Sequence, residues 1–148
     1  MKSSLLAGVA ISAALAGGAA ADVEFRRSEA TEQAGLPFSD AVKVGNVLYL
    51  SGAIGNLPGK MELAPGGLQA EARQAMENIG TTLAVNGATF DDVFKCTVML
   101  ADMAQWSAFN EVYVGYFKPG RMPARSAFGA SGLALGAALE IECWAVAR

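Results

Sequence analysis

The chain has 148 residues, of which 53% are hydrophobic, so it is long enough for one domain with a sizeable core and too short for two ordinary domains. Its formal net charge is −3 and it contains no histidine. These numbers exclude a Ser-His-Asp triad and a His-ligated zinc, and they argue against nucleic acid as the main partner, because phosphate binding needs clustered Lys and Arg.

The first 21 residues have the three-part pattern of a secretory signal peptide. Lys2 gives a positive start, residues 5–16 are apolar and mostly small, and Ala19 and Ala21 form a small-x-small cleavage site. The alternative is a buried or membrane-anchoring helix, but the stretch is of marginal length and rich in Ala and Gly. We therefore predict a periplasmic or secreted protein, whose mature domain, residues 22–148, has no membrane partner after cleavage.

The mature chain opens with a predicted β-hairpin. Residues 41–44 and 47–51 are β-prone runs, and Gly45-Asn46 between them has the glycine that a tight two-residue turn needs. Residues 52–67 are rich in Gly and Pro and are expected to form a loop.

Two helices follow, separated by a strand. Residues 68–85 repeat apolar side chains at three- and four-residue spacing, and Asn86-Gly87 is expected to end that helix. Residues 93–100 are expected to form a strand buried more fully than a half-exposed one. Asp102 is a good N-cap for a second helix of similar length. The apolar stripe of that helix is Trp106, Phe109, Tyr113, Tyr116 and Phe117.

Residues 125–128 and 139–146 complete the expected order β-β-α-β-α-β-β. Two helices would cover one face of a sheet, which predicts an α+β fold, a sandwich of two layers. The strands carry apolar residues on the other face as well. We therefore expect an oligomer in which the sheets of different copies meet.

The two cysteines, Cys96 and Cys143, lie in predicted strands and outside any C-x-x-C motif. In an oxidising compartment two buried strand cysteines can form a disulfide bond. We favour the other interpretation, in which both are small apolar side chains that fill the core.

Arg125 stands just before a run without charged side chains, Ala127 to Leu139. Its guanidinium either extends along its stem to solvent, pairs with a carboxylate such as Glu140, or is held inward for an anion. A planar guanidinium binds a carboxylate through two parallel hydrogen bonds, which Lys cannot reproduce. The residues alone leave these alternatives open.

Four segments together resemble the RidA family, also called YjgF. They are VGNVLYLSGAIG, ARQAMENIGTTLAVNGATFDDVFKCTVMLADMAQWSAFNEVYVGYF, PARSA and GAALEIECWAVA. The resemblance covers about residues 35–147, and its motifs SG, NEVY, PARSA and EIE are specific as a set. It implies a chorismate-mutase-like fold with a mixed sheet, and a homotrimer with ligand clefts between subunits. It also implies hydrolysis of reactive 2-enamino and 2-imino acids to 2-oxo acids and ammonia, with no metal or organic cofactor.

The resemblance assigns roles to residues of this chain. Arg125 is expected to hold the substrate carboxylate in the cleft. Glu140, the first acid of EIE, is expected to orient or activate the attacking water. Glu142 shares its strand face but is expected to be a solvated edge carboxylate. Ser51 would place a hydroxyl near the ligand, and Asn110 would form hydrogen bonds in the trimer or the cleft.

Three departures from the family pattern concern the same cleft. Phe38 stands where the family often has Tyr, so the ring is kept and a hydroxyl is lost. Ala127 stands where the family often has Cys, so only backbone groups there can help to hold the substrate nitrogen or the water. The segment after Arg125 lacks the usual Leu-Pro. These departures leave the arginine in place and the identity of the substrate open.

Export leaves two functions in competition. One is a deaminase for an imine made outside the cytoplasm by an amino-acid oxidase or dehydrogenase. The other is a non-catalytic, small-ligand-binding or holdase-like trimer of the same fold. The combination of Arg125 with Glu140 favours the enzyme, because a binding protein needs the carboxylate clamp and has no need of an acid that orients water.

Overall fold

A computed structural model describes residues 21–147 of the chain. The predicted signal peptide therefore lies, apart from Ala21, outside the described residues. Within the described range, none of the helices combines the length and the apolar character that crossing a membrane requires.

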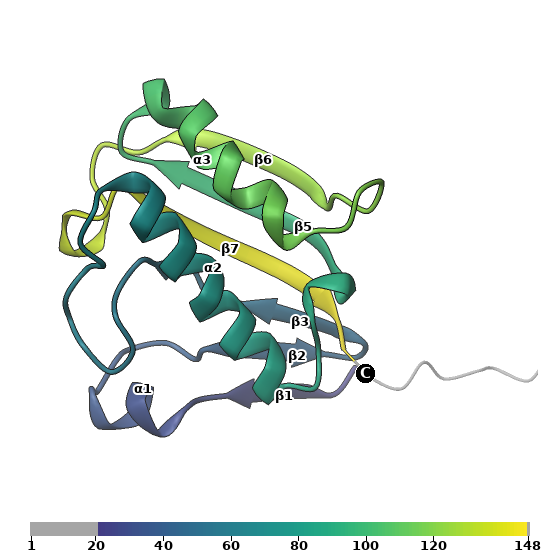
Figure 1. Cartoon of the computed structure of the whole chain (residues 1–148). Helices are drawn as coiled ribbons and strands as arrows, with labels where there is room; N and C mark the ends of the chain where they lie inside the picture. Colours follow the sequence, from purple (N-terminus) through teal and green to yellow (C-terminus); the bar gives the residue numbers. More distant parts are fainter. Residues whose placement is uncertain (1–20, 148) are drawn as a thin grey trace, which may run out of the picture.

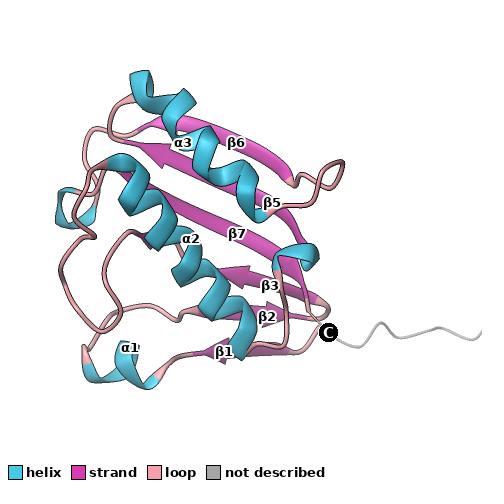
Figure 2. Cartoon of the chain, in the orientation of Figure 1, coloured by secondary structure: helices cyan, strands magenta, loops and turns pink. Residues whose placement is uncertain are grey.

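The described chain folds into one mixed sheet with helices packed on one of its faces (Figures 1 and 2). The strands are β1 (Val23–Arg26), β2 (Ala41–Val44), β3 (Val47–Leu50), β4 (Ala53–Ile54), β5 (Val93–Leu100), β6 (Ala124–Gly129) and β7 (Leu139–Val146). The helices are α1 (Glu29–Gln33), α2 (Leu68–Val85) and α3 (Trp106–Tyr113). This arrangement confirms the expected two-layer α+β sandwich.

The strand order is β1-β2-β3-β7-β5-β6, and the short β4 also pairs with β7. Only β5 and β6 run parallel, while the other pairs are antiparallel. The predicted hairpin is present as β2 and β3, with Gly45 at φ 59° in its turn. As a result β6, which carries Arg125, is an edge strand, and β7, which carries Glu140, lies inside the sheet.

Helix α2 forms most of the helical layer, as its spacing predicts. Its apolar stripe is almost fully buried against the sheet: Leu68, Ala72, Ala75, Met76, Ile79 and Leu83. Burying one Leu or Ile side chain contributes about 1.5–3 kcal/mol to folding. The stripe therefore fixes α2 on the sheet and leaves α3 to cover the strands at the β6 edge (Figure 1).

The second helix is shorter than expected, with 8 residues against 18 in α2. Asp102 does act as an N-cap, since its carboxylate accepts the Ala104 N–H at 2.9 Å, but the turn it caps is a 3-10 turn over Met103–Gln105. A further 3-10 turn, Val114–Tyr116, follows the helix. The apolar stripe fitted one long helix equally well, because a pattern of side chains does not report a change of helical pitch.

Strand β1 and helix α1 were missed because their local signals are weak. Helix α1 has five residues and is held by side chains: Ser28 caps it, and Asp40 accepts hydrogen bonds from the Ser28 N–H and the Thr31 hydroxyl. Strand β1 forms by pairing with β2. Tertiary contacts, which a short window of sequence does not contain, therefore create both elements.

The face of the sheet away from the helices is rich in apolar side chains. The rings of Tyr49 and Trp144 pack edge to face at 4.9 Å, and Phe94 lies 6.4 Å from Trp144. Phe94 is 40% exposed in the single chain, so β5 is less buried than we expected. A solvated sheet face would carry polar residues at these positions.

The two cysteines form a disulfide bond between β5 and β7, so the interpretation of two separate apolar side chains is wrong. Cys96 and Cys143 are direct cross-strand partners, with Cα atoms 4.1 Å apart, and both are fully buried. The register of β5 against β7 decides this pairing, and nothing in the local sequence around either cysteine reports that register.

Candidate functional site

The sheet places Arg125 and Glu140 of one chain on opposite faces. Arg125 is the cross-strand partner of Cys96, which is in turn the partner of Cys143, so the three side chains share the helix-covered face. Glu140 alternates along β7 with the buried Leu139 and Ile141 and therefore lies on the open face. This geometry excludes an ion pair between Arg125 and Glu140 within one copy.

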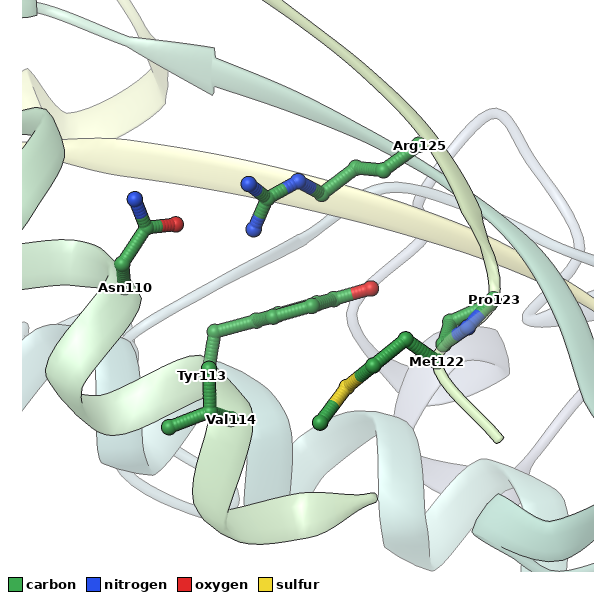
Figure 3. Close-up of a pocket in the computed structure, with 6 residues that line it drawn as sticks. All are labelled: Asn110, Tyr113, Val114, Met122, Pro123 and Arg125. Atoms are coloured by element: carbon green, nitrogen blue, oxygen red, sulfur yellow. The ribbon is translucent and has the colours of Figure 1, made fainter. Parts of the chain in front are cut away.

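Arg125 lies in a pocket of about 490 Å³, which we call the arginine pocket (Figure 3). Its lining residues are Asn110, Tyr113, Val114, Met122, Pro123 and Arg125. In Figure 3, Asn110 from α3 and Arg125 from β6 point toward one another above the ring of Tyr113. The structure thus brings together two of the predicted site residues, Arg125 and Asn110.

The guanidinium of Arg125 lies over three aromatic rings of α3. Its central carbon is 4.4 Å from the ring centroid of Trp106, 4.6 Å from that of Tyr113 and 5.9 Å from that of Phe109. Such cation–π contacts contribute about 0.5–2 kcal/mol each. We call these three residues, spaced i, i+3 and i+7 along one side of the helix, the aromatic stripe.

Among the described residues, no carboxylate pairs with Arg125 and no protein acceptor takes one of its hydrogen bonds; the ion pairs there involve Arg26, Lys43 and Lys118. The cation therefore neither extends freely into solvent nor neutralises a protein acid. Its N–H donors remain available to an anion that enters the pocket.

Two buried polar atoms in the arginine pocket also lack a hydrogen-bond partner: Oδ1 of Asn110 and the hydroxyl of Tyr113. Burial raises the pKa of Tyr113 to about 12, against a smaller opposing effect of the positive charge on Arg125. Tyr113 is therefore a neutral hydrogen-bond donor near pH 7. An unsatisfied buried polar group costs about 1–3 kcal/mol, so the pocket favours a ligand or partner that supplies the missing bonds.

Glu140 lines a second cavity, a wider groove of about 1360 Å³, which we call the glutamate groove. Phe38, Ser51, Gly52 and Leu135 line it as well. A Cβ atom at Gly52 would collide with the Glu140 carboxylate, so the glycine of the SG motif gives this carboxylate its place. The structure thus brings Phe38, Ser51 and Glu140 together, away from Arg125.

Ser51 lies in the glutamate groove, and its hydroxyl already has a partner within the protein. Its hydroxyl donates a hydrogen bond to the Ser39 carbonyl at 2.6 Å, and its backbone N–H donates to the Asp40 carbonyl at 3.0 Å. The side chain thereby ties β3 to the segment that carries Phe38, which is 45% exposed. Only the acceptor capacity of the hydroxyl is left for a ligand.

Of the two remaining predicted positions, Ala127 lies on the edge strand β6 and Glu142 on the interior strand β7. Ala127 shares the Arg125 face of β6 and packs against the core, while one side of the β6 backbone has no partner strand among the described residues. Glu142 is the cross-strand partner of Thr97 and sits within the sheet. Our expectation of an edge carboxylate at Glu142 is therefore wrong, although it shares the open face with Glu140 as predicted.

Sequence reasoning missed further residues in both cavities. Trp106 and Tyr113 contact Arg125, but their helical spacing was attributed to the core alone. Leu135, which lines the glutamate groove, has a left-handed backbone with φ 58°, which no feature of its neighbours in the sequence signals. Within residues 21–147, no cluster of three or more His, Cys, Asp or Glu residues is placed to hold a metal ion.

The chain is similar in sequence to one protein family and to relatives with named activities. The sequence model of the family Endoribonuclease L-PSP matches residues 29–147. The mouse protein 2-iminobutanoate/2-iminopropanoate deaminase is 44% identical over 110 residues, which cover 74% of this chain and 81% of the mouse protein. The human protein of the same name is 42% identical over 110 residues, with 74% and 80% covered.

Solved structures agree with these relatives. The crystal structure of RidA from the Antarctic bacterium Psychrobacter has a TM-score of 0.70 and 38% identity, and the match covers 74% of this chain and 88% of that one. The structure of YEO7 from yeast has a TM-score of 0.78 and 33% identity, with 86% of this chain and 100% of that chain covered.

Proposed function

The chain belongs to the Endoribonuclease L-PSP family, which is the YjgF/RidA family, and on that premise we propose that it is a hydrolytic deaminase. Its substrates would be reactive 2-enamino and 2-imino acids, and its products 2-oxo acids and ammonia. The names of the mouse and human relatives support this reaction class. The word endoribonuclease in the family name suggests RNA as a substrate, but a chain with a net charge of −3 offers little attraction to a polyanion.

The observation that carries the proposal is the division of the site into two halves. The arginine pocket offers a cation with free N–H donors, and the glutamate groove offers a carboxylate on the opposite face of the sheet. We propose a homotrimer in which the arginine pocket of one copy faces the glutamate groove of its neighbour. The apolar open face around Tyr49 and Trp144 supports such an assembly, because burying it needs a partner surface.

The two halves divide the chemistry of imine hydrolysis between them. Arg125 binds the substrate carboxylate with two parallel hydrogen bonds, and Asn110 Oδ1 accepts a hydrogen bond from the substrate nitrogen. Glu140 takes a proton from water while the water oxygen bonds to the imine carbon, and the C=N electron pair moves to nitrogen, which takes up a proton. In the resulting tetrahedral carbinolamine the hydroxyl loses its proton and its oxygen forms the C=O bond as the C–N bond breaks. The nitrogen takes up a proton and leaves as ammonia, which gives the 2-oxo acid.

The second candidate function is a trimer that binds a small carboxylate without hydrolysing anything. The arginine pocket favours it, since the clamp is complete without Glu140. Imines generated in the cuvette from amino acids by an amino-acid oxidase distinguish the two functions. A deaminase increases the rate of ammonia release in proportion to the concentration of the protein. A protein that only binds carboxylates leaves that rate unchanged, although it binds added 2-oxo acid.

Mixing two inactive variants tests the shared site. Arg125→Ala keeps an intact Glu140, and Glu140→Gln keeps an intact Arg125. In a cyclic trimer, three quarters of the assemblies in an equal co-expressed mixture contain both variants, and each has one intact site of three. We expect about a quarter of the wild-type activity to return. A mixture as inactive as its components, with mixed trimers demonstrated by mass spectrometry, contradicts a site shared between copies.

We further propose that the protein is exported and cleaved after Ala21. The position of β1 supports this, because cleavage there leaves every described strand and helix intact. Mass spectrometry of the protein purified from its native host should find Asp22 at the N-terminus. An intact Met1 on cytoplasmic protein would contradict export.

A further inference from the structure

Arg125 is held in an unusual way for a partly enclosed cation. Among the described residues, it contacts three rings of α3 and no acid. A carboxylate partner would hold the side chain equally well, but it would occupy the same N–H groups that a substrate carboxylate needs. A ring face attracts the positive charge from above and leaves the donors at the guanidinium edge free.

The ring contacts are closest at the two ends of the aromatic stripe. Trp106 and Tyr113 lie 4.4 and 4.6 Å from the central carbon of the guanidinium, while Phe109, between them, lies at 5.9 Å and is fully buried in the core. Within the aromatic stripe the ring of Phe109 contacts that of Tyr113. The ring of Tyr113 also contacts Phe117, which lies outside the stripe. Phe109 and Tyr113 therefore anchor the aromatic stripe under Arg125 in the core.

From these contacts we propose that Trp106 and Tyr113 are positioning residues, which hold Arg125 ready to bind a small planar carboxylate and act through their rings. The inference deepens the proposed function, since it concerns the carboxylate half of the same site, but carboxylate binding is measurable whether or not imines are hydrolysed. An arginine on a flexible stem loses side-chain entropy when a ligand fixes it. The rings reduce that loss because they restrict the guanidinium before the ligand arrives.

The test compares substitutions that keep a ring with substitutions that remove it. Trp106→Phe and Tyr113→Phe keep an aromatic face, and the second removes the hydroxyl as well. Trp106→Leu and Tyr113→Leu are the matched variants without a ring. The probe is 2-oxobutanoate, and its Kd is measured by calorimetry on protein whose oligomeric state and circular dichroism match those of the wild type.

We expect each Leu variant to bind 2-oxobutanoate about 3- to 30-fold more weakly than the wild type. We expect Trp106→Phe to stay within about 3-fold of it, and Tyr113→Phe, which also loses the hydroxyl, to bind more tightly than Tyr113→Leu. In an Arg125→Ala background, Trp106→Leu should cause no further loss, because the ring acts only through the cation. With imine substrates the Leu variants should raise KM and leave kcat within about 3-fold, as expected for residues that do not touch the reacting atoms.

Two results would overturn the proposal. One is an equal loss of affinity in the Phe and Leu variants of the same position, which would mean that the ring face is irrelevant. The other is an undiminished effect of Trp106→Leu when Arg125 is already Ala, which would assign the loss to general packing. If 2-oxobutanoate binds as expected and no imine is hydrolysed, the positioning role stands and the deaminase function fails.

Discussion

The arginine pocket and the glutamate groove hold their charged side chains in different ways. In the arginine pocket a charged group rests on apolar rings, its N–H donors are unpaired and two further polar atoms beside it lack partners. In the glutamate groove the two predicted polar groups are placed by the backbone: the Ser51 hydroxyl bonds to the Ser39 carbonyl, and the Glu140 side chain packs against Gly52. One half is prepared for a ligand, and the other half holds an acid in a set place.

In the proposed trimer, this difference would assign binding and chemistry to different copies of one fold. Arg125 and Glu140 lie on opposite faces of a single sheet, so the proposed site needs both cavities, from two copies. Substitutions in the arginine pocket should act mainly on affinity, and substitutions in the glutamate groove should act mainly on turnover. The following predictions test that division, from the largest expected effect to the smallest.

Glu140→Gln should cause the largest loss of activity. An amide cannot take the proton from water, so kcat should fall about 10²- to 10⁴-fold, the range of general acid–base catalysis. The Kd for 2-oxobutanoate should stay within about 3-fold of the wild type, because Arg125 is untouched. The measurement is steady-state imine hydrolysis together with calorimetry. A variant that loses affinity and turnover in proportion would break the division between the two halves.

Arg125→Ala should affect binding first. Loss of a charge-assisted bidentate contact should reduce kcat/KM about 10²-fold or more. Arg125→Lys should recover little, since it keeps the charge and loses the planar fork. Kinetics on both variants, with the trimer verified by light scattering, checks this. Full activity in a trimeric Arg125→Ala protein would mean that the arginine pocket does not bind the substrate.

The disulfide bond connects the two regions covalently, since Cys96 is the register partner of Arg125 and Cys143 is on the strand of Glu140. Replacing both cysteines by Ala should lower the free energy of unfolding by about 2–4 kcal/mol, as expected for a closed loop of this size. Urea unfolding with and without reductant measures it. Reductant should destabilise the wild type and leave the double variant unchanged, and equal sensitivity of the two would contradict the bond.

Gly52→Ala should disturb the glutamate groove alone. The added Cβ displaces the end of the Glu140 side chain, so kcat should fall about 10- to 100-fold while affinity for 2-oxobutanoate is kept. Gly132→Ala is the matched control, because a Cβ there meets no atom within 4 Å. Parallel kinetics on the two variants tests the effect. Equal activities would show that Glu140 does not depend on Gly52 for its position.

The smallest effect concerns the pH dependence of stability in the arginine pocket. Burial raises the pKa of Tyr113 to about 12, above its value near 10 in the unfolded chain. The contribution of Tyr113 is fully present below pH 10 and is lost as the pH rises toward 12, because the unfolded chain releases this proton first. Urea unfolding between pH 9 and 12 should therefore show a smaller alkaline loss in Tyr113→Phe than in the wild type. Identical losses would contradict the burial of this phenol.

Sequence reasoning was most accurate where a periodic pattern is long. The bounds of α2, β5 and β7 agree with the structure at both ends, because 8 to 18 residues of consistent spacing leave little freedom. It failed for α1 and β1, which are short and depend on Asp40 and on pairing with β2. It also overestimated the second helix, whose apolar stripe continues through two changes of helical pitch.

The sequence by itself determined the α+β class, the helical layer and the residue types of the candidate site. These follow from local spacing and from short motifs of adjacent residues. Only the tertiary structure decided how those residues are grouped. The register of β6 on β5 and of β5 on β7 places Arg125 beside the rings of α3, joins Cys96 to Cys143 and puts Glu140 on the other face. Register joins residues distant in the chain, and a shift by one position would exchange the faces of every side chain on a strand.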